Sequence, residues 1–599
     1  MIERSSEPYK IPFLIGVVGH RDLREQEIPA IRTSIAQLLS RLKTTFPDVR
    51  PSLLTSMAEG ADLLAAQVAV ELDIPVTAVL PLPMPACRAD LHTETDRETF
   101  DRILAKSELL QVAFDPRSAA ALDQDTLITR RDLHFQRAGV LVARYSTLLI
   151  VIWDGKDTDH RAGTARVVEC RRRGIVLNGD DEQPIGNALL SIQDNDLMYE
   201  IRCSRRSDRE AAGQQAAESA TRGGLNDTVQ VLGFIGAGAA GGEQIPQSLT
   251  TVLGRIAEFN RDVDKFAAEI ASRGTRLAAA SPHPEPGQLA YLDQLFSAAD
   301  WLGSHYRRSF TFALRTRYTL WAIMAFLLVS FKKESVGVIG TITILGVLSV
   351  FAVAFVFAEW AHKRSWHRKY LDYRALAEGL RVEFYWEIAG VHARVDGAFA
   401  HESFLQKQDV ELEWIRTAMR AVSLRHAVMT GGDVPGGFEQ AFAGWVGDDD
   451  PVNGSGQLRY YRQRIDAFEK RLHFSEWIGA GLLVAGLLLA AAFSAEMLLR
   501  SRVEILPENL RVLMLWGLAL LPVYAVIFDT YVSDKADRAL IRQYRYMYSL
   551  FGIAARELRI ATTEDRKLDT LRALGYACLA EHAEWILGHR EKRIEGLRW

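Results

Sequence analysis

The uncharged run from Val336 to Ala358 constrains this chain more than any other stretch. It holds 23 residues without a charged side chain. At about 1.5 Å per helical residue it would extend about 34 Å, enough to cross the hydrocarbon core of a bilayer, which is about 30 Å thick. We therefore predict a transmembrane helix here, and the rest of the chain has to fold beside lipid.

Three further apolar runs are candidate spans. Trp477–Ala495 and Val512–Phe528 are uncharged, whereas Tyr318–Phe331 has only 14 residues and is short enough for a buried helix of a soluble protein. We count it as a span because Arg317 before it and Lys332–Lys333 after it can extend to the two membrane interfaces. The prediction is an all-α membrane domain with four transmembrane helices.

The predicted spans contain few polar groups. Hydroxyl side chains, which pack helices more often than they bind ions, occur at Thr341, Thr343, Ser349 and Ser494. Carboxylates expected to face the headgroups lie at the span ends, at Glu359, Glu496 and Asp529. Pro522 is expected to kink the fourth span. Because no chain of charges runs through the spans, a proton-coupled transporter is disfavoured.

The cations beside the spans predict an orientation. They precede the first and third spans and follow the second and fourth, at Arg307, Arg308, Arg315, Arg317, Lys363, Arg364, Arg368, Lys369, Lys470, Arg471, Lys535, Arg538 and Arg542. The positive-inside rule then places both termini in the cytoplasm, with outer loops at Lys332–Ser335 and about Leu499–Arg511. The first residues lack a signal-peptide pattern, so we expect a multi-pass protein of the cell inner membrane.

Charge and cysteines exclude some classes of partner. The formal net charge is −4, so no global basic field indicates nucleic acid. The cysteines, expected to be buried thiols, form no CxxC or His/Cys cluster that would indicate a disulfide framework or zinc; they are Cys87, Cys170, Cys203 and Cys578. No cofactor is identified from these residues.

Residues 12–178 alternate apolar strands with amphipathic helices, the pattern of a parallel sheet wrapped by helices. The predicted strands are Phe13–Val18, Ser52–Thr55, Pro75–Leu80, Leu109–Ala113 and Leu148–Trp153. The predicted fold class is therefore an α/β Rossmann-like parallel-sheet domain followed by the all-α membrane domain.

Loops after three of these strands carry residues suited to an anionic ligand. Ligands of open α/β sheets bind at the carboxyl ends of the strands, where glycines allow close approach and helix N-termini favour anions. The candidate ligand-binding residues are Gly19, His20, Arg21, Asp22, Ser56, Glu59, Gly60, Ala61, Asp62, Asp154, Gly155, Gly163 and Thr164. The simpler interpretation is that these glycines only make tight turns. Three such loops in succession favour a nucleotide site.

Individual residues keep two interpretations. The run His20-Arg21-Asp22 fits a helix cap with a surface salt bridge, or an Arg21 that contacts a phosphate or base. Glu59 and Asp62 likewise have a ligand-binding and a structural interpretation. Asp62 either binds ribose hydroxyls or caps its own helix.

Three segments of this head resemble the SLOG superfamily: GVVGHRDL (Gly16–Leu23), TSMAEGADLLAAQVAVELDIPVTAVLPLP (Thr55–Pro83) and STLLIVIWDGK…AGTARVVECRRRGI (Ser146–Ile175). That superfamily comprises Rossmann-like nucleotide-binding domains, including DprA, the LOG hydrolases and the sensor domain of TRPM channels. The resemblance covers about the first 205 residues, with DLMYEIRCSRR (Asp196–Arg206) similar to the strand that closes such domains. It implies a cytoplasmic domain that binds a nucleotide or a nucleotide-derived signal.

The chain departs from the LOG pattern at one position. LOG hydrolases carry PGGxGTxxE, and here the glycine pair before Gly163-Thr164 is missing while Val167 stands at the glutamate position. Glu169 lies two residues further along, about half a helical turn from the required face. Glycosidic hydrolysis is therefore disfavoured, and binding is favoured.

The stretch Ile235–Gly241 contains GxGxxG, but no βαβ unit surrounds it, so we predict a flexible Gly/Ala loop there.

Residues 247–306 then have the pattern of two amphipathic helices. Beyond Trp360 the helical pattern continues without a breaker. Asp448–Gly456 is expected to be a solvated linker between the two hairpins.

A pair of spans followed by a helix rich in Arg and Tyr occurs twice, which suggests a diverged duplication. The stretches YRALAEGLRVEFYW (Tyr373–Trp386) and EHAEWILGHR (Glu581–Arg590) resemble SLATT modules. Those are two-span effector domains associated with SLOG and proposed to perforate membranes in antiviral conflict. The resemblance implies a membrane effector of that class.

The predicted domains are 1–206 for the ligand-binding head, 207–309 for linker and coupling helices, 310–390 for the first hairpin and its extension, 391–473 for a cytoplasmic helical region, and 474–599 for the second hairpin and the C-terminal helices. The leading hypothesis is a homo-oligomeric effector in which a nucleotide-type ligand gates a channel or disruptive pore. The alternative is a membrane-anchored nucleotide hydrolase of LOG type, in which Glu59, Asp62 or Glu169 would supply acid–base chemistry.

Overall fold

The computed structural model describes residues 9–111, 124–156, 163–173, 175–178, 181–184, 197–207, 229–236, 242–277, 287–330, 338–391, 412–424, 436–450, 454–499, 507–535 and 537–591. The chain divides into two compact units. Unit 1 is Met1–Trp301 with Ala375–Ala441 and Leu568–Trp599, and unit 2 is Leu302–Arg374 with Phe442–Lys567. Helices α11 and α13 contribute residues to both units.

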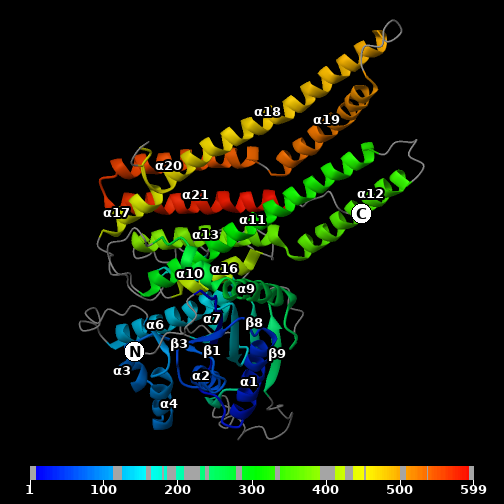
Figure 1. Ribbon diagram of the computed structural model, residues 1–599. Coiled ribbons are helices and arrows are strands. Elements are labelled where there is room, and N and C mark those ends of the chain that lie inside the picture. The colour runs from blue at the N-terminus through cyan, green and yellow to red at the C-terminus, as the bar shows by residue number, and fades with distance from the viewer. Residues whose placement is uncertain are drawn as a thin grey trace. The chain divides into compact units, whose positions relative to one another are not determined.

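Unit 1 contains a sheet of seven strands in the order β4-β3-β2-β1-β5-β8-β9 (Figure 1). All neighbouring pairs are parallel except β8 and β9, which are antiparallel. The strands are β1 (Phe13–Gly19), β2 (Pro51–Thr55), β3 (Val76–Leu80), β4 (Glu108–Gln111), β5 (Leu148–Trp153), β8 (Met198–Arg202) and β9 (Gln230–Ile235). The predicted α/β fold is confirmed.

Helices cover both faces of this sheet. On one face α1 (Ile28–Thr45), α2 (Ala61–Glu71) and α4 (Glu94–Leu104) pack against one another, and on the other α6 (Gln124–Tyr145) packs against α7 (Thr164–Arg173). The right-handed connection between parallel strands accounts for this, because the chain crosses toward β4 through the first group and back through the second. Strands such as β5 are buried along their whole length, as expected between two helical layers.

The remaining described elements of unit 1 are short or helical. They are α3 (Met84–Ala89), the hairpin β6 (Ile175–Asn178) and β7 (Asp181–Pro184), α9 (Gln247–Lys265), α10 (Ala267–Arg273), α16 (Glu413–Ser423), α17 (Gly437–Ala441) and most of α21 (Glu564–Glu591). The strand β9 pairs antiparallel with β8 at the sheet edge. It therefore starts no βαβ unit, and most of the GxGxxG stretch, residues 237–241, lies outside the described residues.

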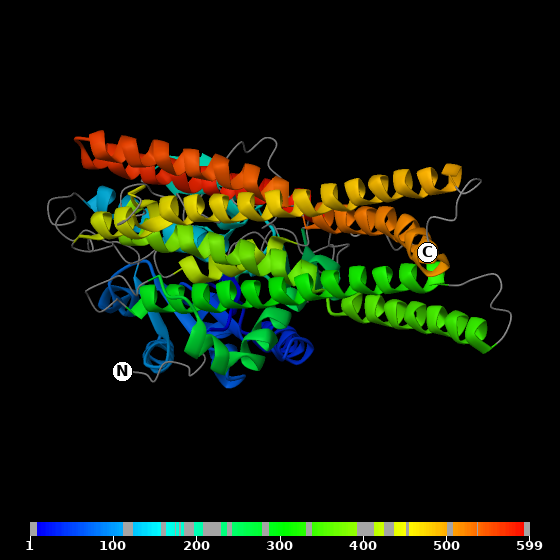
Figure 2. The ribbon, with the colours of Figure 1, turned by 45° about the horizontal axis from the view of Figure 1, so that its top comes forward.

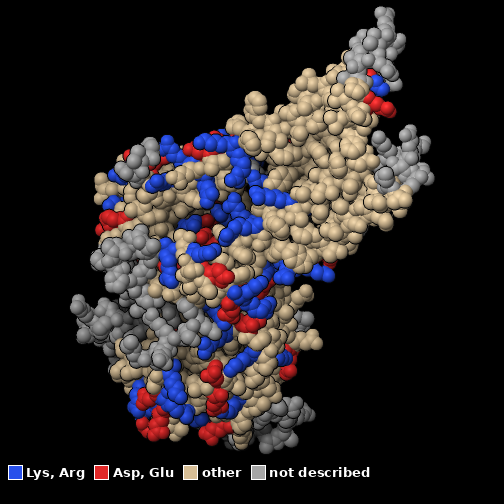
Figure 3. All heavy atoms as spheres, in the orientation of Figure 1, with Lys and Arg blue, Asp and Glu red and all other residues tan. Residues whose placement is uncertain are grey.

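Unit 2 contains the apolar helices. They are α11 (Gly287–Ser330), α12 (Val338–Lys363), α18 (Gly456–Leu499) and α19 (Glu508–Asp534), each of which includes a stretch long and apolar enough to cross a membrane. Figure 3 shows that, on the face drawn, these stretches are almost free of charged side chains. The four predicted spans are therefore present as helices, while the two outer loops that join them lie mostly outside the described residues.

The four helices form two pairs, α11 with α12 and α18 with α19 (Figures 1 and 2). Phe312 of α11 stacks on Phe357 of α12 with ring centroids 6.3 Å apart, and α18 packs along α19. Between the hairpins, Phe326 of α11 meets Trp516 of α19 at 5.7 Å. The described contacts thus follow the order α12-α11-α19-α18, and no more than 11% of any apolar stretch is buried.

The structure corrects two predictions of helix continuity. The second of the two helices expected in 247–306 is not separate, because α11 runs from Gly287 into the first span without interruption. In contrast, the pattern beyond Trp360 is interrupted. Helix α12 ends at Lys363 and α13 (Trp366–Ile388) starts after Ser365, whose φ of 50° is left-handed and breaks the helix.

The same series of three helices occurs twice along the chain. Helices α11 and α18 have 44 residues each, α12 and α19 have 26 and 27, and α13 and α20 (Asp537–Ile560) have 23 and 24. Tyr373 of α13 meets Tyr306 of α11 at 5.7 Å, and Tyr544 of α20 meets Tyr461 of α18 at the same centroid distance. These correspondences support the predicted duplication.

The segment expected to be a solvated linker is an ordered turn in its described part. It follows a π-helical turn, η3 (Phe442–Val446). Arg462 Nη1 lies 3.0 Å from Asp449 Oδ1, the Tyr548 hydroxyl donates to the other oxygen of Asp449, and Arg559 Nη2 lies 2.9 Å from Asp448 Oδ1. The acidic run is therefore fixed by cations and a hydroxyl from α18 and α20, which composition alone did not reveal.

Candidate functional site

The strand order places a topological switch point between β1 and β5. These neighbours are parallel, and the connection after β1 leads to β2 on one side while the connection after β5 leads to β8 on the other. In open α/β sheets the crevice at the carboxyl ends of such a pair is the usual ligand site. The residues that follow β1 and β5, His20 and Asp154, are both candidates from the sequence.

The structure brings His20 and Asp154 into direct contact. His20 Nε2 lies 3.0 Å from Asp154 Oδ1, and it accepts a hydrogen bond of 3.0 Å from the backbone N–H of Asp154. Arg205, which follows β8, donates from Nε to His20 Nε2 at 3.2 Å and lies 3.1 Å from Asp154 Oδ2. Side chains after β1, β5 and β8 therefore meet at one edge of the sheet.

The two acceptors in this cluster have shifted pKa values. Burial lowers the pKa of His20 below its usual range, against the Asp154 carboxylate, which works to raise it. Burial works to raise the pKa of Asp154, but the Lys156 backbone N–H, His20 and the charge of Arg205 together hold that pKa below its usual value. At neutral pH the cluster therefore holds a neutral imidazole, a carboxylate and a guanidinium.

The loop after β2 makes hydrogen bonds within itself and to the loop after β1. The Asp62 carboxylate is buried in the first turn of α2 and accepts a hydrogen bond of 2.9 Å from the Ser56 hydroxyl. Burial raises the pKa of Asp62 to about 6. The backbone N–H of Ala61 donates to the carbonyl of His20 at 3.1 Å. Asp62 therefore does not cap α2 as the second interpretation expected, because the N-cap is Gly60 without a side-chain cap; it holds the Ser56 loop instead, and its ribose-binding role stays a prediction.

Glycine is required where these two loops touch. Gly60 has a φ of 83°, and a β-carbon there would lie 2.3 Å from the carbonyl oxygen of Arg21. A β-carbon at Gly19 would lie 2.4 Å from that of Ala61. These glycines therefore make tight turns and close packing. That is the simpler of their two predicted roles, and it leaves the ligand-binding role a prediction.

Arg21 shares a carboxylate with a second arginine. Its Nη1 lies 2.9 Å from Asp90 Oδ2, and Arg131 of α6 pairs with the other oxygen of Asp90. Both guanidinium groups lie over the ring of Phe135, at 4.4 and 5.7 Å from its centroid. Arg21 thus takes part in a surface ion pair, and its partners Asp90, Arg131 and Phe135 were not among the residues that the sequence suggested.

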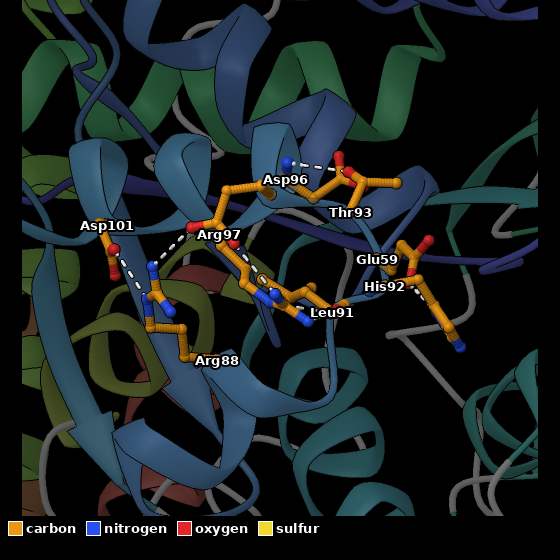
Figure 4. A network of polar contacts seen from close by, with 9 residues as sticks. Glu59, Arg88, Leu91, His92, Thr93, Asp96, Arg97 and Asp101 are labelled. Atoms are coloured by element: carbon orange, nitrogen blue, oxygen red, sulfur yellow. Dashed lines mark hydrogen bonds and ion pairs between the residues drawn. The ribbon is translucent and has the colours of Figure 1, made fainter.

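Glu59 faces Asp90–Thr93, the short segment that joins α3 to α4 and is called the strap below. Figure 4 shows its carboxylate against His92, whose ring Nδ1 and backbone N–H both contact Oε2. The strap is held by its own contacts. Arg97 donates to the carbonyl of Leu91 at 2.9 and 3.1 Å, and the Thr93 hydroxyl accepts the N–H of Asp96 at the start of α4. The strap therefore carries both Asp90 and His92 to the carboxyl edge.

The remaining candidates lie further from this cluster. Asp22 accepts a hydrogen bond of 2.7 Å from the Ser207 hydroxyl, so it holds the segment after β8. Gly155, with a φ of 75°, lies against the guanidinium of Arg202. Gly163 and Thr164 form the start of α7, but residues 157–162 before them lie outside the described residues.

The position that would carry a LOG-type glutamate faces the protein interior. Val167 is buried, and a β-carbon at Gly139 of α6 would lie 2.7 Å from its methyl group. Glu169 pairs with Arg166 and with Arg173, whose Nη1 lies 3.0 Å away. Neither residue presents a free carboxylate at the start of α7.

The polar groups of the spans have mixed outcomes. Ser349 and Ser494 donate to the carbonyl four residues earlier in their own helices, at 2.7 and 2.8 Å, and both lie on exposed faces. Glu359 and Asp529 are exposed, as expected for the headgroup region. The prediction for Glu496 is wrong, because its carboxylate is buried against Arg511.

Among the described residues, no group of His, Cys, Asp and Glu side chains could hold a metal ion. All four cysteines are free thiols, three of them buried. Comparisons with protein-family models, curated proteins and solved structures found no match to this chain. The fold itself defines its class: a Rossmann-like α/β unit in the same chain as four helices able to span a membrane.

Proposed function

We propose that this protein is a membrane effector whose α/β unit binds a nucleotide or nucleotide-derived signal and thereby controls the four-span unit. The observation that carries the proposal is the switch point between β1 and β5 in a chain that also holds four apolar helices. The resemblance to the SLOG and SLATT families supports it and suggests antiviral defence. The cation pattern favours an inner-membrane protein with both termini in the cytoplasm.

Continuity of the chain suggests how binding is transmitted. Helix α11 starts among residues of unit 1 and contains the first span, without a described break between them. A ligand that binds one conformation of unit 1 better than another can bias such a helix. Changing a population from 1:99 to 99:1 requires about 5.5 kcal/mol of differential binding.

The effector state is proposed to be a homo-oligomer. The four helices make contacts in a row and leave their apolar faces largely exposed, so one copy encloses little. The hydroxyls of Ser349 and Ser494 lie on those faces. Association through these faces would place the two hydroxyls between copies, where small polar groups help helices to pack.

The test uses the full chain, because unit 1 includes residues 375–441 and 568–599 as well as the N-terminal sheet. A thermal-shift screen of nucleotides in detergent would be followed by ion flux in proteoliposomes with each ligand that stabilises the protein. We expect a stabilising ligand to change the flux. A ligand that binds tightly and leaves flux unaltered would contradict gating.

The hydrolase alternative has less support. The buried Val167 and the paired Glu169 leave no free carboxylate at the start of α7. Release of free base from nucleoside monophosphates by the same preparation would revive that alternative, and the screen should therefore include an assay for the base.

A further inference from the structure

We infer that Arg21 and Arg131 form a phosphate subsite, and that Asp90 occupies it until the phosphate of a ligand displaces it. The inference deepens the proposed function, on which it rests for the class of ligand. It assigns to Asp90 the role of an internal competitor and to the two arginines the recognition of a phosphate group.

The geometry is that of two cations converging on one anion. Arg21 Nη1 lies 2.9 Å from Asp90 Oδ2, and Arg131 Nη2 contacts Oδ1, so each carboxylate oxygen takes one guanidinium. Arg21 follows β1, Arg131 belongs to α6, and Asp90 follows α3. Phe135 lies within cation–π distance of both guanidinium groups. Three separate parts of unit 1 thus converge at the carboxyl edge of the sheet.

Both arginines of this arrangement keep exposed surface, although the charge of Arg21 also acts on the buried Asp62. Two guanidinium groups share the Asp90 carboxylate, and the side chains of Arg21 and Arg131 remain 43% and 45% exposed, against 19% for Asp90. A terminal phosphate carries a charge of about −1.5 to −2 and three acceptor oxygens. Because guanidinium groups bind phosphate in the same forked geometry as carboxylate, a phosphate matches this pair of cations better than Asp90 does.

Asp90 is not needed to hold the strap on which it lies. Arg88 of α3 reaches Asp101 and Glu94 of α4 at 2.9 and 3.2 Å, and Arg97 holds the carbonyl of Leu91 (Figure 4). The backbone of Asp90 ends α3 through its own N–H, which donates to the carbonyl of Ala86 at 3.1 Å. The strap should therefore keep its fold when the Asp90 carboxylate is neutralised.

The experiment measures binding of AMP, adenosine and inorganic phosphate to the full-length protein by isothermal titration calorimetry. Asp90→Asn should tighten AMP binding several-fold. Arg21→Ala and Arg131→Ala should each weaken it by about tenfold or more, since a hydrogen bond to a charged group contributes on that order. Arg261→Ala is the matched control, because Arg261 pairs with Asp48 at 2.6 Å in front of β2, at the amino edge of the sheet. It should leave AMP binding unchanged.

Asp90→Glu keeps the negative charge and should bind AMP with the affinity of the natural protein. This control shows whether Asp90→Asn acts by removing a competing carboxylate or by disturbing the fold. The inference is overturned if Asp90→Asn binds AMP no more tightly than the natural protein, if adenosine binds as well as AMP, or if neither phosphate compound binds at millimolar concentration. Ligand-dependent ion flux would still stand in the first two cases, so failure of this inference is distinguishable from failure of the proposed function.

Discussion

Arg511 and Glu496 form a buried ion pair between the ends of α18 and α19. Nη2 and Nε of Arg511 lie 2.8 and 3.1 Å from the same oxygen, Oε1, of Glu496. The side chains are only 16% and 4% exposed. The pair therefore closes the second hairpin at the end where its two helices are joined, and it neutralises a carboxylate that would otherwise be buried alone.

Removal of Arg511 alone should destabilise this hairpin strongly. Arg511→Leu leaves the Glu496 carboxylate buried without its counter-ion, which costs about 3–5 kcal/mol. The double variant Glu496→Leu with Arg511→Leu should recover most of that loss. The measurement is unfolding of the full-length protein in mixed micelles with increasing SDS. Equal losses in the single and double variants would argue against the pair, and Lys363→Ala, which breaks an exposed pair with Glu359, serves as the control with little effect.

Neutralising Asp62 should stabilise unit 1 near neutral pH. Its pKa is raised by burial from 3.8 to about 6, so its contribution to stability is fully present below pH 3.8 and is lost as the pH rises through 6. Asp62→Asn removes this loss, and the difference corresponds to at most about 3 kcal/mol. Melting temperatures of both proteins from pH 4 to 8 should diverge as the pH rises. Parallel curves would show that Asp62 is not buried as a carboxylate.

Protonation of His20 should act in the opposite direction. Burial depresses its pKa, so its contribution to stability is present above the ordinary value of 6.5 and is lost as the pH falls toward the depressed pKa. His20→Gln keeps an acceptor for the Asp154 N–H but does not titrate. The natural protein should therefore lose stability relative to this variant on acidification below about pH 6.5. A constant difference across the range would contradict the assignment of a neutral imidazole at His20.

The packing of Trp386 on Gly575 should be intolerant of a single methyl group. A β-carbon at Gly575 of α21 would lie 2.4 Å from the buried Trp386 ring, whose Nε1 donates to the Leu571 carbonyl at 3.1 Å. Gly575→Ala should cost about 1–3 kcal/mol through overpacking. Gly588→Ala on the same helix meets no atom within 4 Å and should stabilise by up to about 1 kcal/mol. Thermal unfolding compares the two, and equal effects would contradict the predicted close packing.

Local patterns in the sequence were sufficient for most of the strands of unit 1 and for the four spans, though not for where α11, α12 and α13 begin and end. The buried strand β5 has the bounds that its apolar run predicted, Leu148–Trp153, and the spans follow uncharged runs such as Val336–Ala358. Hydrophobic periodicity and length depend only on neighbouring residues, because each strand or helix has to bury its own apolar face. The fold class and the presence of four apolar helices could therefore be predicted from the sequence.

Contacts between distant residues could not be predicted in this way. His20 and Arg205 are separated by 185 positions, and nothing near Asp90 indicates that it pairs with Arg21 and Arg131. The burial of Glu496 likewise depends on Arg511 from the next helix.

The sequence by itself determined where strands, spans and glycine-rich turns lie, because those features arise from local hydrophobicity and backbone freedom. Tertiary structure alone decided which charges are paired, which titrate abnormally and which arginines converge, because electrostatic energies depend on distance and burial in space.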